Sequence, residues 1–284
     1  MPDDVIARAD LTPPDATMIH PSAVVAPGAE IGRGVRIGPF CSVGPDVVIA
    51  DGAELVSHVV VDGHTSIGAG AKLFPFCTVG LPPQDLKYKG EPTRCVIGAR
   101  TQIREHCSVH RGTPNGLGVT TVGEGCMLMA VTHVAHDCTL GNGVIVANNA
   151  VMGGHVWIGD NAVIGGQSAL HQFARIGRGA MISGVTGVAA DVVPFGMVFG
   201  NRGVLTGLNV IGLSRRGYER ARIHRLRAAF RQLFAGEDVF ARRLELVHAQ
   251  YADEPLVAEM LAFIAAPSER GLIQANLSGE IDAE

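Results

Sequence analysis

A six-residue repeat runs through most of the chain. Every sixth position holds a medium-sized aliphatic residue in three stretches, residues 25–79, 97–109 and 122–188. The position four residues after each aliphatic is small or β-branched, as Cys41 and Ala53 illustrate, and glycine often follows the aliphatic directly. One such unit cannot bury its apolar side chain alone, whereas a stack of units can. The repeat therefore predicts a column of short, nearly identical units.

This pattern resembles that of the hexapeptide-repeat proteins, whose fold is a left-handed parallel β-helix. The resemblance implies coils of three short strands, with the aliphatic pointing inward and the small residue near a corner. We expect the β-helix over residues 20–193, after an N-terminal extension of residues 1–19. The aromatic content of only 5% and the 37 glycines suit such a column, because glycine adopts the unusual φ values of tight turns.

The cysteines follow the same repeat. All six fall in its small inward position: Cys41, Cys77, Cys95, Cys107, Cys126 and Cys138. Free cysteine is a good small buried residue, and no two of these are spaced as CxxC. We therefore expect buried thiols and not the disulfides that an even count can indicate.

Composition excludes several classes of partner. The formal net charge of −4 gives no bulk attraction to nucleic acid or to an anionic membrane. The first eighteen residues carry aspartates, among them Asp3, Asp4 and Asp10, and no apolar stretch, unlike a signal peptide. No run of eighteen apolar residues occurs in the chain. We expect a cytoplasmic protein without stable membrane insertion and without nucleic acid.

Two interruptions break the repeat. The first is LPPQDLKYKGEPTR at residues 81–94, and the second is RGTPNGLGVT at residues 111–120. Long surface insertions cost little closure entropy, so both are compatible with tolerated loops. Binding and catalytic residues often lie on such loops, however, and His110 immediately precedes the second one.

The hydrophobic period changes after residue 193. Helical spacing links the apolar residues of three segments: Ile223, Leu226, Phe230, Leu233 and Phe234, then Leu244, Val247 and Tyr251, then Leu256, Met260, Leu261 and Ile264. Pro255 suits the start of the third helix. We expect a small C-terminal helical domain over residues 194–273, followed by a tail at 274–284.

The residues between the hexads discriminate among β-helix families. They are QDLKYKGEPT at 84–93, IREHCSVHRGT at 103–113, HVAHDCTLGN at 133–142, GGHVWIGD at 153–160, LHQFARIG at 170–177 and GLNVIGLSRRG at 207–217. In this order they closely resemble the UDP-N-acetylglucosamine O-acyltransferase family of lipid A biosynthesis, over residues 20–273. The resemblance implies transfer of a 3-hydroxyacyl chain from acyl carrier protein to the glucosamine 3-position of UDP-N-acetylglucosamine. It also implies a homotrimer with sites between neighbouring β-helices, and no cofactor.

The chemistry needs a base, because a sugar hydroxyl is a poor nucleophile at neutral pH, and histidine has a suitable pKa. The resemblance gives this role to His136, with Asp137 holding the ring and Gly154 offering a backbone N–H to the oxyanion. Adjacent residues of one flat strand point to opposite faces, so His136 and Asp137 can cooperate only if a corner relaxes that rule.

Further residues match binding positions of the family. The resemblance assigns contacts with the UDP-sugar or the acyl chain to ten of them: Gln84, Asp85, Lys87, His133, His155, His171, Gln172, Asn209, Arg215 and Arg216. Gly184 matches the position where a larger residue shortens the acyl chain, so glycine predicts a longer chain. Arg202 departs from the family, which often has histidine there.

The first helical segment is rich in arginine, with seven arginines against one acid, Glu219, over residues 215–231. A charge run of this kind is usually a solvated face, but a basic patch would also speed encounter with an acidic carrier protein. We expect it to dock the carrier.

Other functions remain open from the residues. Four histidines near one another could bind zinc, as in the γ-class carbonic anhydrases, although the spacing favours no metal. The N-acyltransferase of the same pathway has an additional N-terminal uridine-binding domain, for which residues 1–19 leave no room. A non-catalytic β-helix scaffold would not need the HVAHDC motif.

Overall fold

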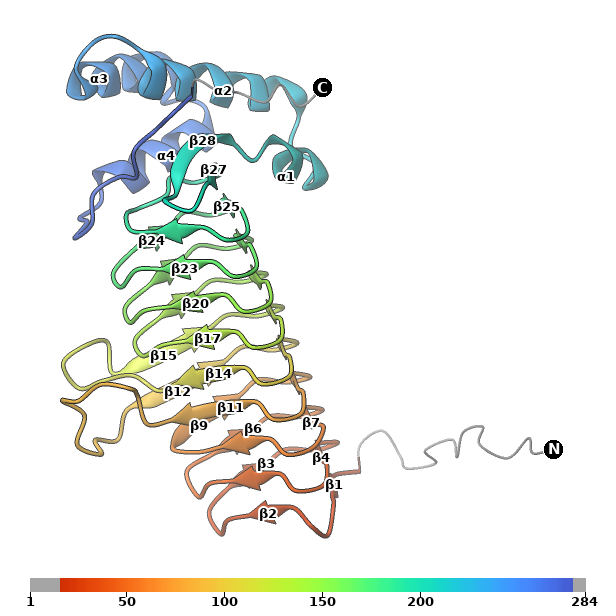
Figure 1. The fold of residues 1–284 in the computed structure, drawn as a ribbon. Coiled ribbons are helices and arrows are strands. Elements are labelled where there is room, and N and C mark those ends of the chain that lie inside the picture. The colour runs from red at the N-terminus through yellow and green to blue at the C-terminus, as the bar shows by residue number, and fades with distance from the viewer. Residues whose placement is uncertain (1–15, 278–284) are drawn as a thin grey trace.

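The computed structural model describes residues 16–277, so most of the expected N-terminal extension and of the tail lies outside the described residues. The chain winds into a column whose coils each contribute one strand to three parallel sheets (Figure 1). Along most of the column, each strand pairs with the third strand after it in the sequence. In uninterrupted coils the paired residues are eighteen apart, as in Met18↔Arg36 and Val24↔Ser42. This is the predicted left-handed parallel β-helix, because three hexads make one coil.

The three sheets are named A, B and C. Sheet A contains β1 (Met18–Ile19), β4 (Arg36–Ile37), β7 (Glu54–Leu55), β10 (Lys72–Leu73), β13 (Gln102–Ile103), β16 (Met127–Leu128), β19 (Ile145–Val146), β22 (Val163–Ile164), β25 (Met181–Ile182), β27 (Gly196–Phe199) and β28 (Val204–Leu208). Sheet B contains β2 (Val24–Val25), β5 (Ser42–Val43), β8 (Val60–Val61), β11 (Thr78–Leu81), β14 (Ser108–His110), β17 (His133–Val134), β20 (Val151–Met152), β23 (Ala169–Leu170) and β26 (Gly187–Val188). Sheet C contains β3 (Glu30–Ile31), β6 (Val48–Ile49), β9 (His64–Ile67), β12 (Arg94–Ile97), β15 (Val119–Val122), β18 (Thr139–Leu140), β21 (Trp157–Ile158) and β24 (Arg175–Ile176).

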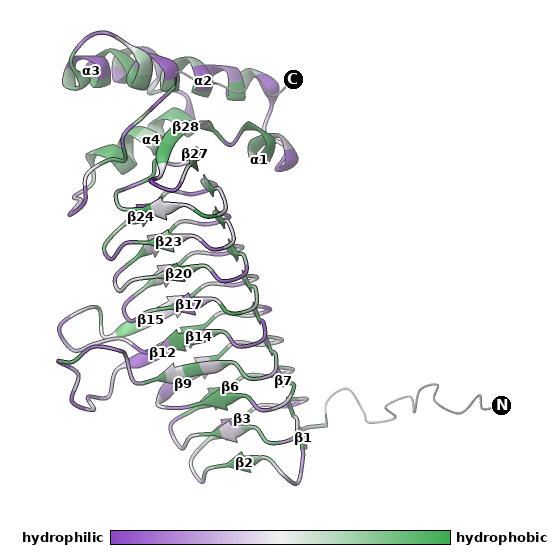
Figure 2. Ribbon diagram, in the orientation of Figure 1, coloured by the Kyte–Doolittle hydropathy of each residue, from purple (hydrophilic) through white to green (hydrophobic). Residues whose placement is uncertain are grey.

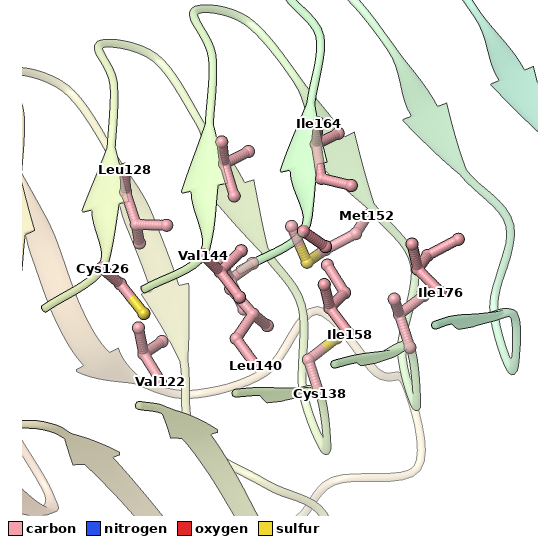
Figure 3. Packing of buried hydrophobic residues seen from close by; sticks show 14 of the residues in the cluster. Val122, Cys126, Leu128, Cys138, Leu140, Val144, Met152, Ile158, Ile164 and Ile176 are labelled. Carbon is pink, nitrogen blue, oxygen red and sulfur yellow. The ribbon is translucent and has the colours of Figure 1, made fainter. Parts of the chain in front are cut away.

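The aliphatic residue of each hexad fills the column. Figure 3 shows Val122, Leu140, Ile158 and Ile176 of sheet C pointing inward from successive coils, beside Leu128 and Ile164 of sheet A. Aliphatic side chains at equivalent positions stack one coil apart and bury apolar surface from both neighbours, which is the main stabilising term of such a fold.

All six cysteines are buried and unpaired, as the repeat predicted. Burial raises the pKa of the Cys95 and Cys138 thiols to about 12, since the charged thiolate is poorly solvated in the core. These thiols are therefore inert packing groups near neutral pH.

Turns connect the sheets along three edges of the column, which we call the A–B, B–C and C–A edges. Figure 1 shows that both interruptions form loops on the same side. The first, residues 82–93, joins β11 to β12, and the second, residues 111–118, joins β14 to β15. Both therefore lie on the B–C edge.

Four helices follow the antiparallel pair β27 and β28: α1 (Val210–Arg215), α2 (Arg220–Ala235), α3 (Phe240–Tyr251) and α4 (Pro255–Ala265). Figure 2 shows α2 and α3 alternating between hydrophilic and hydrophobic residues, whereas α4 is largely hydrophobic. Arg178 of the column pairs with Glu259 of α4 and donates to the Tyr218 hydroxyl, which ties the helices to the last coils. Among the described residues, no helix is long and apolar enough to cross a bilayer.

Candidate active site

The B–C edge collects most of the predicted site residues. Above the two loops, three successive turns from sheet B to sheet C carry His136 with Asp137, Gly154 with His155, and His171 with Gln172. Since neighbouring strands lie about 4.8 Å apart, these turns stack directly over one another. The two loops and the histidine motifs, separated in the sequence, thus meet along one edge.

His136 and Asp137 cooperate because they occupy a corner. Asp137 has a φ of 59°, a left-handed conformation that turns its side chain back toward its neighbour. The His136 Nδ1 lies 2.8 Å from the Asp137 Oδ2. The alternation of a flat strand would have kept the two apart, and the turn removes that constraint.

The second loop covers the Asp137 carboxylate. The Thr113 hydroxyl donates to Oδ2 at 2.6 Å, and the backbone N–H groups of Thr113 and Gly118 each donate to Oδ1 at 3.0 Å. Gly116 packs against the same group, where an added Cβ would lie 2.5 Å from both the Cγ and the Oδ2 of Asp137. The side chain of Asp137 is fully shielded from solvent. The second interruption is therefore a cap on a buried carboxylate.

The donors around Asp137 decide its charge. Burial alone raises the pKa of a carboxyl, but hydrogen bonds from Thr113 and His136 outweigh it, so the pKa of Asp137 lies below its ordinary value. Asp137 is therefore ionised at neutral pH, and its position beside His136 favours the proton of that ring on Nδ1.

Gly154 lies against the ring of His136. An added Cβ would stand 2.5 Å from Cε1 and 2.8 Å from Nε2 of His136. Among the described residues, the Gly154 N–H has no hydrogen-bond acceptor. A free N–H beside the imidazole suits an oxyanion donor, and only glycine leaves the ring its place.

His155 stacks between the two neighbouring turns. Its ring lies parallel to Phe173 at 4.5 Å and edge-on to His136 at 5.2 Å. Burial lowers the pKa of His155, although the nearby Asp137 carboxylate opposes the shift. The exposed His171 and Gln172 lie in the next turn up.

His133 lies on sheet B, in strand β17, just before the turn that carries His136. Its Nδ1 is 2.7 Å from the Ser108 hydroxyl, and its ring meets His110 edge-on at 4.9 Å. Burial lowers the pKa of His133 and brings that of His110 to about 4, so both rings are neutral at pH 7. His110 Nδ1 is buried without a hydrogen-bond partner. The sequence pattern gave no signal for Ser108.

The first loop brings a carboxylate toward the histidines. The electrostatic field of Asp85 reaches His155, while its Oδ1 accepts from the backbone N–H of Lys87. Gln84 and Lys87 are exposed. Tyr88 of this loop lies over the guanidinium of Arg111, with 5.8 Å from the ring centroid, so the two loops contact each other.

The remaining predicted residues lie on other edges. Asn209 caps α1 and donates to the Gly179 carbonyl, and Arg216 donates to the Asn161 carbonyl, both on the C–A edge. Arg215, beside Arg216, is exposed. Gly184 lies on the A–B edge, between β25 and β26. A single chain therefore does not bring these residues to His136.

Arg202 lines a cavity of about 600 Å³ against the upper end of sheet B. Its other walls are mostly apolar, among them Leu170, Val188 and Ile273, and His171 also lines it. The cavity thus adjoins the B–C edge, and Arg202 adds a positive charge to it.

The arginine-rich segment is less basic than its sequence suggests. Arg225 pairs with Asp253 and Arg222 with Glu254, two acids that precede α4. The sequence segment contains only Glu219 against seven arginines, but folding brings Asp253 and Glu254 next to two of them and lowers the local positive charge. Arg215, Arg220 and Arg227 have no acidic partner within residues 16–277.

A metal is geometrically conceivable at one point. Donor atoms of His136, Asp137 and His155 lie within 4.8 Å of one another. The hydrogen bonds from Thr113, Gly118 and His136 already occupy the carboxylate, which makes it a poor ligand. This donor set fits a hydrogen-bonded base better than a metal ion.

Comparisons with known proteins identify the family of the chain. A family model described as Udp N-acetylglucosamine O-acyltransferase, domain 2, matches residues 191–273, and the bacterial transferase hexapeptide model matches residues 15–44, 28–63 and 120–154. An acyl-[acyl-carrier-protein]–UDP-N-acetylglucosamine O-acyltransferase from Rhizobium johnstonii is 46% identical over 258 residues, which cover 91% of this chain and 95% of the relative. The enzyme of that name from Brucella ovis is 44% identical over 89% of this chain and 91% of its own.

Solved structures give the same result. A UDP-N-acetylglucosamine acyltransferase crystal structure has a TM-score of 0.87 at 40% identity, covering 91% of this chain and 99% of its own. That of Francisella novicida has a TM-score of 0.88 at 32% identity, covering 90% and 94%. Because these relatives share both the fold and a high sequence identity along nearly the whole length, the chain belongs to the UDP-N-acetylglucosamine O-acyltransferase family.

Proposed function

We propose that the chain transfers a 3-hydroxyacyl group from acyl carrier protein to the glucosamine 3-position of UDP-N-acetylglucosamine, the first step of lipid A biosynthesis. The relatives named for this reaction support it. The observation that carries the mechanism is the 2.8 Å contact between His136 Nδ1 and the buried Asp137 carboxylate, with Gly154 against the same ring.

His136 acts as general base in this proposal. Because Nδ1 donates to Asp137, the Nε2 lone pair is free to take the proton of the sugar hydroxyl as its oxygen attacks the thioester carbonyl. Asp137 stabilises the imidazolium that forms. The C–S bond then breaks and His136 gives the proton to the departing thiolate of the carrier, so the step balances without a covalent enzyme intermediate or a cofactor.

The Gly154 N–H stabilises the tetrahedral oxyanion. Within the described part of the chain this N–H has no acceptor, and it lies beside the base, near where the carbonyl carbon must be during attack. His133, His155, His171 and Gln172 then line the site along the B–C edge.

We infer that the working unit is a homotrimer. Gln84, Asp85 and Lys87 belong to the same edge as His136, whereas Asn209, Arg215 and Arg216 belong to the C–A edge. A site that uses both sets needs the C–A edge of a second protomer. Such a site would hold the sugar against the first loop and the nucleotide phosphates near Arg215 and Arg216, a chemistry suited to guanidinium.

The donor carrier would dock on the helical domain. Arg215, Arg220 and Arg227 carry positive charge that Asp253 and Glu254 leave uncompensated, which suits an acidic carrier protein in the cytoplasm. Gly184 matches the family position where a larger residue shortens the acyl chain, so we expect a longer 3-hydroxyacyl chain to be transferred faster than a shorter one.

An acyl-transfer assay tests the proposal. Purified protein would receive a panel of 3-hydroxyacyl carrier proteins with the 3-hydroxyl or the 3-amino form of the UDP-sugar. His136→Ala should lower kcat by about 10²- to 10⁴-fold, the usual contribution of a general base. His248→Ala, an exposed histidine of α3, is the matched control and should keep full activity. Absence of transfer with every pair from a folded wild-type protein would instead favour a scaffold.

A further inference from the structure

The Thr113 hydroxyl is the feature of the second loop that the proposed mechanism does not use. We propose that Thr113 is a positioning residue, which fixes the orientation and charge of Asp137 and thereby holds the His136 proton on Nδ1. This inference rests on the proposed function, in which Nε2 of His136 is the base.

One carboxylate oxygen links the two residues. Asp137 Oδ2 accepts from the Thr113 hydroxyl at 2.6 Å and lies 2.8 Å from His136 Nδ1. Within residues 16–277, these are the only two side chains hydrogen-bonded to the carboxylate. An ionised carboxylate can only accept, so the Thr113 hydroxyl must donate, and the same demand places a proton on His136 Nδ1.

The Thr113 hydroxyl lies in a closely packed, buried site. Thr113 is 3% exposed, and Gly116 packs on the carboxylate so closely that an added Cβ would lie 2.5 Å from Oδ2. A methyl group in place of the hydroxyl would keep the site filled, so Oδ2 would retain only the Thr113 backbone N–H at 3.1 Å and His136, and would lose one donor in a buried site. A carboxylate with fewer donors binds a proton more readily, and a protonated Asp137 no longer requires a donor at His136 Nδ1.

Thr120 offers a matched comparison. It is also fully buried beside Asp137, but its hydroxyl accepts from the Asp137 backbone N–H at 2.8 Å and does not touch the carboxylate. Removing either hydroxyl deletes one buried hydrogen bond of the same residue type. Only the loss of the Thr113 hydroxyl should change the tautomer of His136.

The test compares Thr113→Val, Thr113→Ser and Thr120→Val in the full chain. We expect Thr113→Val to lower kcat about 10- to 100-fold with KM unchanged, since a hydrogen bond to a charged group is lost. Thr113→Ser should restore most of kcat, and Thr120→Val should change thermal stability but not kcat. In protein with ¹⁵N-labelled histidine, assigned with His136→Gln, the Nδ1–H tautomer of His136 should decrease only in Thr113→Val.

Two results would overturn the inference. The first is a Thr113→Val enzyme that keeps the kcat and the His136 tautomer of Thr120→Val. The second is a wild-type protein in which His136 is protonated on Nε2 at neutral pH. This measurement needs no variant, so it tests the inference even if Thr113→Val fails to fold. The tautomer is read without turnover, so failure of the proposed function, seen as full activity in His136→Ala, remains distinguishable.

Discussion

The turns of the B–C and C–A edges have the same backbone conformation but carry different residues at its left-handed position. On the C–A edge, the left-handed position of the turn is usually glycine: Gly34, Gly52, Gly70, Gly125, Gly143 and Gly179. On three successive turns of the B–C edge it is Asp137, His155 and Phe173, with φ between 59° and 66°. A non-glycine residue in this conformation costs about 1–3 kcal/mol. The edge that carries the proposed chemistry thus accepts backbone strain on three successive turns, whereas the C–A edge does so only at isolated turns such as those of Arg100 and Asn161.

Local contacts offset that strain. Asp137 receives hydrogen bonds from the second loop, and His155 stacks on Phe173. The comparison teaches that the repeat supplies a regular scaffold, and that side chains placed in its strained corner can aim at one another in a way that a flat strand forbids. Three experiments would break or sharpen this comparison.

The largest effect should come from Asp137→Asn. An amide cannot stabilise the imidazolium of His136 and presents an NH₂ to donors that expect an acceptor, so kcat should fall on the order of 10³-fold. Steady-state kinetics measure this. Gly143→Asn places the same amide at the equivalent turn position of the C–A edge. If both variants lost activity equally, the two edges would not differ as we argue.

A smaller loss is expected from Gly154→Ala. The new methyl would overlap the His136 ring, and a displacement of about 1 Å at the reacting group can cost about 10²-fold in rate. Gly125→Ala is the matched variant on the C–A edge, because its φ is 61° but no atom lies within 4 Å of the added Cβ. It should lose about 1 kcal/mol of stability and keep kcat. Equal kcat in the two variants would contradict the assigned contact.

The smallest effect is a loss of stability at acid pH. The pKa of His110 falls to about 4 on folding, from an ordinary 6.5, so the folded protein resists its protonation. Its contribution to stability is present above pH 6.5 and is lost as the pH falls toward 4. The protein should be about 2 kcal/mol less stable at pH 5 than at pH 7 from this group alone.

Thermal unfolding at both pH values measures that loss. His110→Asn removes the titrating ring and should flatten the dependence, whereas His248→Asn, on the exposed face of α3, should leave it as in the wild type. An unchanged slope in His110→Asn would show that the acid sensitivity arises elsewhere than at the start of the second loop.

Much of the fold could be predicted from the sequence. The hexad predicted the β-helix and the burial of all six cysteines, and helical spacing predicted segments that lie within α2, α3 and α4, with Pro255 as the first residue of α4. These features depend on local propensity and on which side chains are apolar, and both are written in the order of residues.

The candidate site was only partly predictable. Motifs identified His136, Asp137 and Gly154, but not the role of Thr113, because the donor lies 24 residues from its acceptor. The pairing of Arg222 and Arg225 with acids some 30 residues away was likewise missed. Such contacts depend on which coils and helices lie side by side.

The sequence by itself determined the column, its period and the positions of the two loops, since a six-residue repeat with apolar stacking allows few other solutions. Tertiary structure alone decided that His136 and Asp137 face each other, because that depends on the φ of one corner residue. It also decided that Asn209 and Arg216 lie on a different edge from His136, because that placement depends on how α1 packs against the turns that carry Asn161 and Gly179.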